Sequence, residues 1–416
     1  MRQRKSWFGI NAIVAVFGVA LIVPMSGWAA STYKILHRFT AGADGGYPAA
    51  DLIVDAAGNL YGTAGAAVFQ LKSNADGSWT YSTLHNFTGA DGDSPVGSLV
   101  FDGAGNLYGA TWYGGATFNG TVFKLRPNAD GSWTESVLYS FCSVAKCTDG
   151  QNPVGGLVFD AAGNLYGTTS YGGRISTTCS NGCGVVFKLK PKADGTWAEN
   201  VLYRFCKLTN CPDGDFPTAG LSLDKAGNLY GTTAQGGAFG NGTVFKLNSN
   251  TAWTESVLHS FCPPHNCGDG ARPLTRLILD ASGNLYGTAS LGGTWPGYGV
   301  AFKLKPKSDG SWGESVLHSF NKQDGAYPWA DLIFDPAGNL YGTTRNGGSA
   351  GDGVVFKLSP GSGGSWVYSA IHNFLGNPEL TPLGGVVLDQ AGNLYGTTNI
   401  CASGTGCYGV VFEITP

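Results

Sequence analysis

Charge is scarce in this chain: Asp, Glu, Lys and Arg make up 13% of its 416 residues, and the formal net charge is -3. No Lys/Arg run occurs after the first five residues, although binding to phosphate backbones depends on a concentrated basic surface. This argues against nucleic acid and other phosphate-rich partners. A P-loop, a His-Glu-x-x-His helix and a nucleophile elbow are also missing from any matching context. No catalytic residue is therefore assigned.

Long apolar runs are missing after residue 23, and no later segment repeats apolar residues with a helical period. The one such run, from Phe8 to Val23, follows a basic start and precedes small residues at Gly27–Ala30, the layout of a signal peptide. We predict a signal peptide at 1–29 and one exported, secreted or periplasmic domain at 30–416. A retained membrane anchor is the alternative interpretation, because the run approaches spanning length.

Glycine is abundant, with 66 residues, and it recurs at fixed places. The phrase Gly-Asn-Leu-Tyr-Gly occurs seven times, beginning at Gly58, Gly105, Gly163, Gly227, Gly283, Gly338 and Gly392. Each copy lies within four short β-rich segments separated by turn residues, here called strands a, b, c and d. Such units predict the blades of a β-propeller, because one four-stranded sheet cannot bury both of its faces.

The two ends of the chain predict closure of the ring. The first recognisable segment, Tyr33–Phe39, has the pattern of a strand d, and the last, Val410–Ile414, has that of a strand c. The fold class is therefore expected to be all-β, a seven-bladed propeller whose last blade is completed by the N-terminal strand. Closure removes the free sheet edges that an open array exposes.

The repeat itself resembles a known family. The pattern Asp-x-x-Gly-Asn-Leu-Tyr-Gly-Thr, then Gly-Gly, Val-Phe-Lys-Leu, Trp and Leu-His-Ser-Phe is similar to the secreted bacterial tandem repeats called GloVer. The resemblance covers Tyr33 to Pro416 and implies a secreted protein without assigning an activity. The a–b hairpin also resembles NHL-type propeller repeats, and this resemblance implies that strand a is innermost.

Ten cysteines fall into five close pairs. Even count, export signal and tight pairing predict local disulfides. Metal binding is the alternative, but structural zinc usually brings two pairs together, often as Cys-x-x-Cys, and these spacings are wider. The predicted pairs are Cys142–Cys147, Cys179–Cys183, Cys206–Cys211, Cys262–Cys267 and Cys401–Cys407.

Loop lengths single out one face of the ring. The b–c connection varies from 8 residues between Tyr61 and Phe69 to 21 between Tyr166 and Phe187, whereas the a–b turn is constant. Loops b–c and d–a share one end of an up-and-down blade, so variation and all cysteine pairs collect there. We call this end the loop face. Loops on a rigid scaffold commonly carry binding residues; tolerance of insertions is the alternative explanation. The loop-face candidates for ligand binding are Trp112, Tyr113, Tyr171, Arg174, Trp295, Tyr298 and Arg345.

A second group of candidates lies at the head of strand a, where the copies mostly carry Gly or Ser. Asp51, Arg276 and Asp331 are charged there, with Trp329 nearby. They can serve a polar ligand at the channel mouth, or they can simply pair with neighbours. No resident cofactor is predicted, although six Asp-Gly pairs in d–a loops leave a Ca²⁺ ring open as an alternative to turn formation.

Three functions remain open. The first is an exported, monomeric binding module for an extracellular carbohydrate or protein, with no membrane contact once the signal is cleaved. The second is a hydrolase or lyase acting on polysaccharide or a lactone through the charged residues at the channel mouth. The third is a structural extracellular repeat protein without a discrete site.

Overall fold

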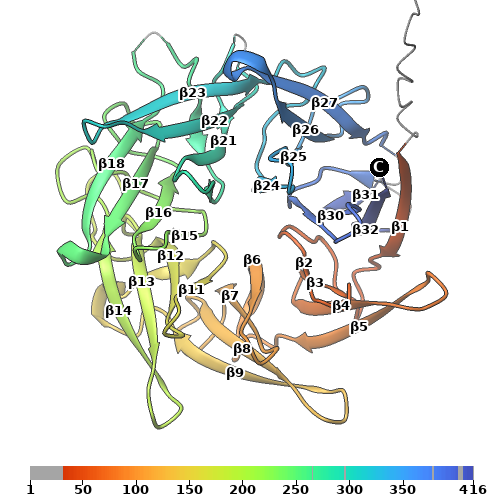
Figure 1. Ribbon diagram of the computed structural model, residues 1–416. Coiled ribbons are helices and arrows are strands. Elements are labelled where there is room, and N and C mark those ends of the chain that lie inside the picture. Colours follow the sequence, from red (N-terminus) through yellow and green to blue (C-terminus); the bar gives the residue numbers. More distant parts are fainter. Residues whose placement is uncertain (1–30, 265, 295–296, 377–378, 402–405, 416) are drawn as a thin grey trace, which may run out of the picture.

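The chain forms a seven-bladed β-propeller in a computed structural model that describes residues 31–264, 266–294, 297–376, 379–401 and 406–415. The blades follow one another around a central opening, with strand a innermost and strand d outermost (Figure 1). The predicted fold class is confirmed. The predicted signal peptide at 1–29 and Trp295 lie outside the described residues. No helix within the described ranges is long and apolar enough to cross a membrane.

The first four blades are built as follows. Blade 1 contains β2 (Ile53–Val54), β3 (Leu60–Ala64), β4 (Ala67–Ser73) and β5 (Trp79–Asn86). Blade 2 contains β6 (Asp93–Phe101), β7 (Leu107–Tyr113), β8 (Thr121–Pro127) and β9 (Trp133–Ser140). Blade 3 contains β10 (Gln151–Pro153), β11 (Val158–Phe159), β12 (Leu165–Tyr171), β13 (Val185–Pro191) and β14 (Trp197–Arg204). Blade 4 contains β15 (Ser222–Leu223), β16 (Leu229–Thr233), β17 (Thr243–Asn248) and β18 (Thr254–Ser260).

The remaining blades repeat this plan. Blade 5 contains β19 (Ala271–Pro273), β20 (Ile278–Leu279), β21 (Leu285–Leu291), β22 (Val300–Pro306) and β23 (Trp312–Ser319). Blade 6 contains β24 (Ile333–Phe334), β25 (Leu340–Thr344), β26 (Val354–Pro360) and β27 (Trp366–Asn373). Blade 7 contains β29 (Val386–Leu388), β30 (Leu394–Thr398), β32 (Val410–Thr415) and β1 (Thr32–Arg38), beside a small ribbon of β28 (Glu379–Leu380) and β31 (Ile400–Cys401). Three 3₁₀ turns are η1 (Ala145–Cys147), η2 (Ser249–Thr251) and η3 (Ser362–Gly364).

Closure of the ring occurs as predicted. Strand β1 pairs antiparallel with β32, and Tyr33 lies opposite Ile414 in this ladder. Figure 1 shows β1 and β32 side by side in one blade. The Tyr33 ring stacks on His372 of blade 6 at a centroid distance of 4.3 Å. The N-terminal strand therefore completes blade 7 and also packs against its neighbour.

The repeat phrase explains how each blade packs on the next. In blade 2, Asp102 accepts hydrogen bonds from the backbone and side-chain nitrogens of Asn106 and from the Tyr108 hydroxyl. The Tyr108 ring meanwhile contacts blade 3, with its centroid 5.0 Å from that of Phe159. All seven repeat Asp residues accept a bond from the Tyr six positions later. These carboxylates thus form turns and orient the interblade tyrosines, as buried polar groups require partners.

Candidate functional site

Seven equivalent residues, one from each blade, surround the channel at the loop face. Each directly precedes the first buried residue of strand a. At this point strand a interrupts its pairing with strand b, as in β6, where the register with β7 shifts between Val96 and Val100. This departure directs the segment toward the axis, where it lines a cavity of about 350 Å³ with its equivalents. The seven residues of this axial ring are Asp51, Ser98, Gly156, Gly220, Arg276, Asp331 and Gly385.

The three charged members of the axial ring meet on one side of the cavity. Arg276 Nε lies 3.2 Å from Asp331 Oδ2, and the backbone N–H of Arg276 donates to Asp331 Oδ1 at 2.7 Å. Asp51 accepts a hydrogen bond from the Ser98 hydroxyl at 3.2 Å and another from the backbone N–H of Gly385. The charged residues of blades 1, 5 and 6 therefore form one connected cluster.

Gly385 lies between the Asp51 carboxyl and the backbone of Asp331, where a side chain has no room. A Cβ at Gly385 would lie 2.9 Å from the Asp331 carbonyl oxygen and 3.1 Å from Asp51 Oδ1. Burial raises the pKa of Asp331 well above its ordinary value, and the Asp51 charge raises it further, whereas Arg276 opposes both. The cluster can therefore hold a proton near neutral conditions and offer both donors and acceptors to a polar ligand.

An aromatic face lies beside this charge cluster. Trp329, two residues before Asp331, lines the same cavity and is 37% exposed. The Arg345 guanidinium from the b–c loop of blade 6 lies 4.2 Å from the centre of the Trp329 ring. Such stacking fixes an exposed indole by a cation–π contact. The sequence placed Trp329 and Arg345 in separate groups, and their contact depends on the path of the b–c loop.

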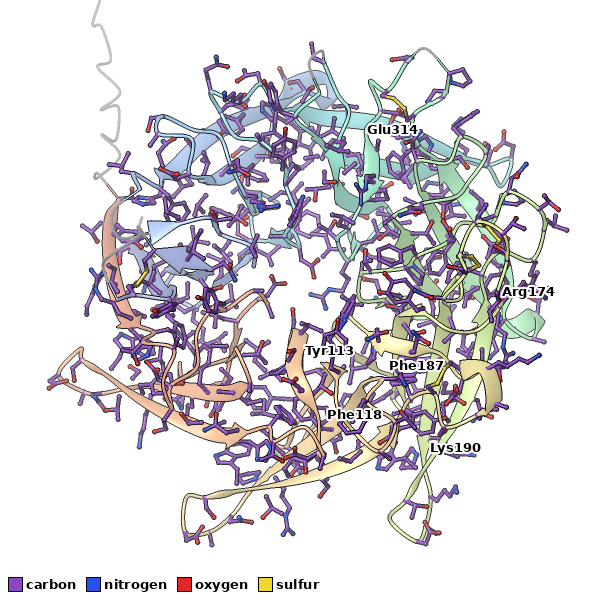
Figure 2. The ribbon with its side chains drawn as sticks, turned by 180° about the vertical axis from the view of Figure 1, so that it is seen from behind. Tyr113, Phe118, Arg174, Phe187, Lys190 and Glu314 are labelled. Atoms are coloured by element: carbon purple, nitrogen blue, oxygen red, sulfur yellow. A yellow bond between two sulfur atoms is a disulfide. The ribbon has the colours of Figure 1, made fainter. Side chains whose placement is uncertain are left out.

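A second aromatic group runs across blades 2 to 4 on the loop face. The Trp112 ring centroid is 6.0 Å from that of Tyr113 and 6.5 Å from that of Tyr171, and Tyr171 contacts Phe216 at 5.1 Å. Tyr113 is 51% exposed and lies close to the central opening in Figure 2. The sequence predicted the first three as candidates but missed Phe216, which a d–a loop contributes.

Arg174 does not join either group. It lies toward the periphery of the ring in Figure 2, and its charge acts on Tyr203 of the outermost strand β14. The predicted site residues thus divide into an axial group (Asp51, Arg276, Asp331, Trp329, Arg345), an aromatic group (Trp112, Tyr113, Tyr171), the peripheral Arg174, and Tyr298, whose ring centroid lies 6.1 Å from that of Tyr327.

Strained backbone holds the loop face in shape. Each blade has one residue of positive φ directly before a proline, and six of these donate their N–H to the b–c loop of the preceding blade, as Phe216 does to the Cys183 carbonyl at 3.1 Å. Non-glycine residues adopt this conformation only where surrounding contacts impose it. The interblade bonds thus fix the d–a loops against the b–c loops. The seven residues are Tyr47, Ser94, Asn152, Phe216, Arg272, Tyr327 and Thr381.

The six d–a loop aspartates that suggested a Ca²⁺ ring bind protein groups. Asp91 accepts bonds from the Thr88 backbone and hydroxyl, and its Oδ2 lies 2.8 Å from His85 Nε2. Asp149 similarly accepts from the Tyr139 hydroxyl and from Ser143. These contacts show the turn role of the aspartates. The strand-d His and Tyr residues are explained as well, because most orient a loop carboxylate.

A set of buried glutamates was missed in the sequence. Each lies two residues after the Trp that begins or directly precedes strand d, and faces the loop aspartate of the preceding blade, as Glu135 faces Asp91. In all four, Oε1 is buried without a hydrogen-bond partner. Burial, above all, raises the pKa of each to about 7. The four residues are Glu135, Glu199, Glu255 and Glu314.

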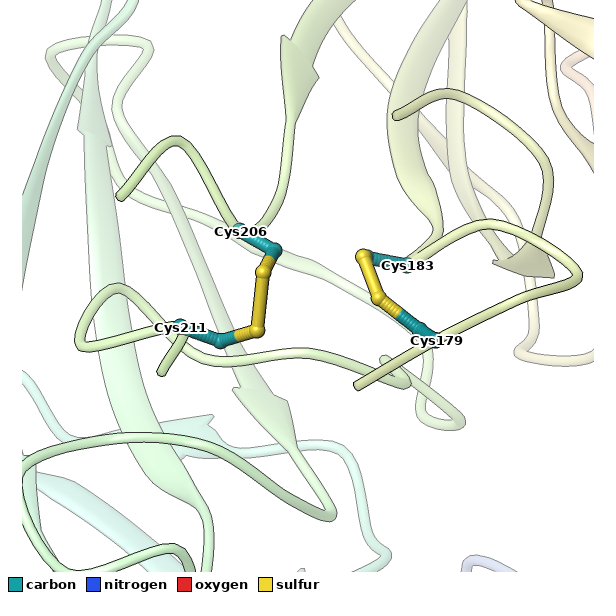
Figure 3. Close-up of side chains that lie close together, drawn as sticks. All are labelled: Cys179, Cys183, Cys206 and Cys211. Atoms are coloured by element: carbon teal, nitrogen blue, oxygen red, sulfur yellow. A yellow bond between two sulfur atoms is a disulfide. The ribbon is translucent and has the colours of Figure 1, made fainter. Parts of the chain in front are cut away.

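The five predicted disulfides are present in the structure. All lie in b–c or d–a loops, and so on the loop face. One pair of disulfides is distinctive, since Cys179–Cys183 and Cys206–Cys211 come from different loops and lie against each other (Figure 3).

Solved structures resemble the chain in fold. Virginiamycin B lyase from Staphylococcus aureus is 15% identical, with a TM-score of 0.54 over 93% of this chain and 99% of that chain. A catalytically inactive His-to-Ala variant of that lyase, with quinupristin, is 14% identical, with a TM-score of 0.55 and the same coverage. The extracellular domain of a putative hybrid two-component system from B. thetaiotaomicron is 13% identical, with a TM-score of 0.54 over 93% of this chain and 41% of that chain.

Sequence comparisons give a more specific result. A model described as the Gloeobacter/Verrucomicrobia repeat matches residues 25–178, 64–297 and 254–416. No curated protein sequence gives a match. The matched segments overlap and together span all seven blades.

Proposed function

This chain belongs to the Gloeobacter/Verrucomicrobia repeat family, and we propose that it is an exported propeller that binds an extracellular carbohydrate or protein through its loop face. Five disulfides support export, because such bonds persist in oxidising compartments. The likeness to an extracellular sensor domain agrees with this location.

The arrangement at the axial cavity carries the proposal. Trp329 presents an aromatic face that Arg345 holds in place, while Asp51 and Asp331 supply carboxyl groups to the same cavity and Arg276 pairs with Asp331. Ligand sites are typically concave, with apolar walls and a few convergent polar groups. A sugar ring has an apolar face and hydroxyl edges that match this combination, so carbohydrate is the favoured ligand. A cavity of about 350 Å³ accommodates one or two such rings and argues against a purely structural role.

Two sets of variants test the proposal by screening a glycan array and bacterial cell-surface extracts. Trp329→Ala with Arg345→Ala is expected to weaken retention at least tenfold if the ligand occupies the cavity. Trp112→Ala, Tyr113→Ala and Tyr171→Ala together abolish retention if the ligand spans the aromatic group. Arg174→Ala serves as the peripheral control. Retention by both sets equal to that of the unsubstituted protein, with unchanged thermal unfolding, would sink the proposal.

A lyase or hydrolase function is the second candidate. The paired carboxyls of Asp51 and Asp331, one with a raised pKa, are a common arrangement for proton transfer. In virginiamycin B lyase, a His-to-Ala substitution accompanies loss of catalysis, whereas the five histidines in the described part of this chain all lie in outermost strands. The reaction proposed for this second candidate uses the carboxyls of Asp51 and Asp331. Turnover of a cyclic lactone or polysaccharide that Asp331→Asn eliminates would favour this candidate over binding alone.

A further inference from the structure

Four cysteine sulfurs converge at the boundary of blades 3 and 4. The Sγ atoms of Cys179, Cys183, Cys206 and Cys211 all lie within 4.8 Å of one another. Cys179 and Cys183 come from the b–c loop of blade 3, and the other two come from the following d–a loop (Figure 3). Two loops separated along the chain thus bring four cysteine sulfurs, in two disulfides, to one point.

The spacing and the geometry suit a structural metal site. Zinc ligands commonly come in pairs separated by two to four residues, and these pairs are separated by three and four. Tetrahedral coordination with Zn–S bonds of about 2.3 Å places the sulfurs about 3.8 Å apart. The four sulfurs lie within 4.8 Å of one another, and once both disulfides are reduced, rotation about the cysteine χ1 angles can bring them to the tetrahedral separation.

The surroundings resemble the outer shell of a thiolate site. The Ser176 hydroxyl lies 3.1 Å from Cys179 Sγ and 3.4 Å from Cys206 Sγ, and the Thr178 hydroxyl lies 3.0 Å from Cys211 Sγ. Each hydroxyl therefore reaches sulfurs of both pairs. Hydrogen bonds of this kind orient ligands and stabilise thiolate charge.

The site is also enclosed. Cys183, Cys206 and Cys211 are 1–3% exposed and pack in the hydrophobic cluster that contains Tyr203 and Phe205. Arg174, on the same b–c loop, raises the local positive potential and acts on Tyr203. A basic neighbour favours a tetrathiolate, whose net charge with Zn²⁺ is negative.

Two other d–a loops with a cysteine pair can be compared with the loop that carries Cys206–Cys211. Cys142–Cys147 and Cys262–Cys267 occupy the same place in their d–a loops as Cys206–Cys211, yet the described b–c loop residues beside them bring no second pair. Among the blades followed by a d–a loop with a cysteine pair, only blade 3 carries a second pair in its b–c loop, which is the longest, with Phe187 21 positions after Tyr166. A single local disulfide is sufficient to pin a d–a loop, so pinning does not explain why two pairs meet here.

We propose that Cys179, Cys183, Cys206 and Cys211 form a Zn²⁺-binding tetrathiolate in the reduced chain, which oxidation converts to the two disulfides. A dithiol or phosphine reductant supplies two electrons to each disulfide, and with two protons each yields two thiols. The four thiols then release four protons as they bind one Zn²⁺. In the reverse direction, two equivalents of a small-molecule disulfide accept the four electrons and, with four protons, become four thiols, while both S–S bonds form and Zn²⁺ leaves.

Cobalt titration of the full chain tests the site. The protein is folded, reduced with a phosphine under anaerobic conditions and titrated with Co²⁺, whose thiolate charge-transfer and tetrahedral d–d bands report four sulfur ligands. One Co²⁺ is expected to bind per chain and to be displaced by Zn²⁺. Cys179→Ser and Cys206→Ser should each lower the affinity at least tenfold, whereas Cys142→Ser and Cys262→Ser should leave it unchanged.

Alkylation mapping provides a measurement that does not depend on cobalt spectra. With one equivalent of Zn²⁺, iodoacetamide should modify six of the ten reduced cysteines rapidly and spare the four proposed ligands. Equal modification of all ten, loss of the cobalt spectrum in the Cys142 or Cys262 controls, or a reduced chain that stays unfolded with Zn²⁺ would each overturn the proposal.

Discussion

Arg276 and Asp331, from adjacent blades, contact each other twice: the guanidinium Nε lies 3.2 Å from Oδ2, and the Arg276 backbone N–H donates to Oδ1 at 2.7 Å. The same carboxyl also interacts with Asp51. One cation therefore balances two carboxyls that blades 1 and 6 bring together, and the charges of this cluster affect the stability of the ring.

Replacing the cation is expected to destabilise the ring. Arg276→Met leaves Asp331 and Asp51 facing each other without compensation, which should lower the free energy of unfolding by about 1–3 kcal/mol at pH 8. The loss should shrink as the pH falls, because protonation of the Asp331 carboxyl removes the repulsion. Urea unfolding at pH 8 and pH 5 measures both effects. Arg126→Met, at an exposed position of β8, is the control and should change little; an equal loss at both pH values would contradict the explanation.

The four buried glutamates give a pH dependence of opposite sign to that of ordinary carboxylates. Their folded pKa of about 7 exceeds the unfolded value of 4.5, so the folded state binds more protons between these values. Their contribution to stability is therefore complete below pH 4.5 and falls as the pH rises to 7. Replacing Glu135, Glu199, Glu255 and Glu314 by Gln should stabilise the protein at pH 8 relative to the unsubstituted chain, with little difference at pH 5.

Urea unfolding of both proteins across this range is the measurement. The difference between the proteins is used because burial lowers the pKa of His372 to about 4, and this independently reduces stability as the pH falls below 6.5. A difference that does not change between pH 5 and pH 8 would show that these glutamates are not protonated in the folded state.

A close approach inside each blade predicts the effect of one methyl group. A Cβ at Gly109 would lie 2.6 Å from Phe123 Cζ and 2.8 Å from Leu99 Cδ2, so Gly109→Ala is expected to cost about 3 kcal/mol through overpacking. Gly103→Ala is the matched control, because nothing lies within 4 Å of a Cβ there. Its effect should be below about 0.5 kcal/mol. Thermal and urea unfolding compare them, and equal effects would count against this packing arrangement.

Removal of the closing strand should change the association state. A chain that starts after residue 39 exposes the edge of β32, whose unpaired backbone groups can pair with a second molecule. Dimers or larger species are expected in light scattering coupled to gel filtration. Tyr33→Ala keeps the strand but loses the stack on His372, and should remain monomeric with about 2 kcal/mol less stability. A truncated chain that stays monomeric with unchanged unfolding would show that closure is dispensable.

The sequence was sufficient to predict the ring because each repeat contains the residues that form its turn and the tyrosine that packs on the next blade. Asp102, Asn106 and Tyr108 lie within seven residues of one another, so their spacing alone indicates the hairpin and the tyrosine that packs on the next blade. The axial position of Asp51, Arg276 and Asp331 followed from comparing equivalent positions among the repeats.

Contacts that depend on loop paths could not be predicted in the same way. The conformations of individual b–c loops place Arg345 on the Trp329 ring and Cys179 close to Cys206. Comparing equivalent positions among the repeats does not predict these loop conformations. The glutamates did leave a signal, since Glu135 and its three equivalents replace a Tyr in strand d. The alternation between Glu and Tyr at this position of strand d reflects the group that the side chain faces in the preceding blade.

The pairing of β1 with β32 also sets the order in which the molecule can be finished. The first strand of the propeller to leave the ribosome pairs with β32, so blade 7 cannot assemble until all seven repeats have been synthesised. Contacts of such sequence separation form slowly. Nascent intermediates expose sheet edges during that delay, and the ring stays open until β32 has emerged.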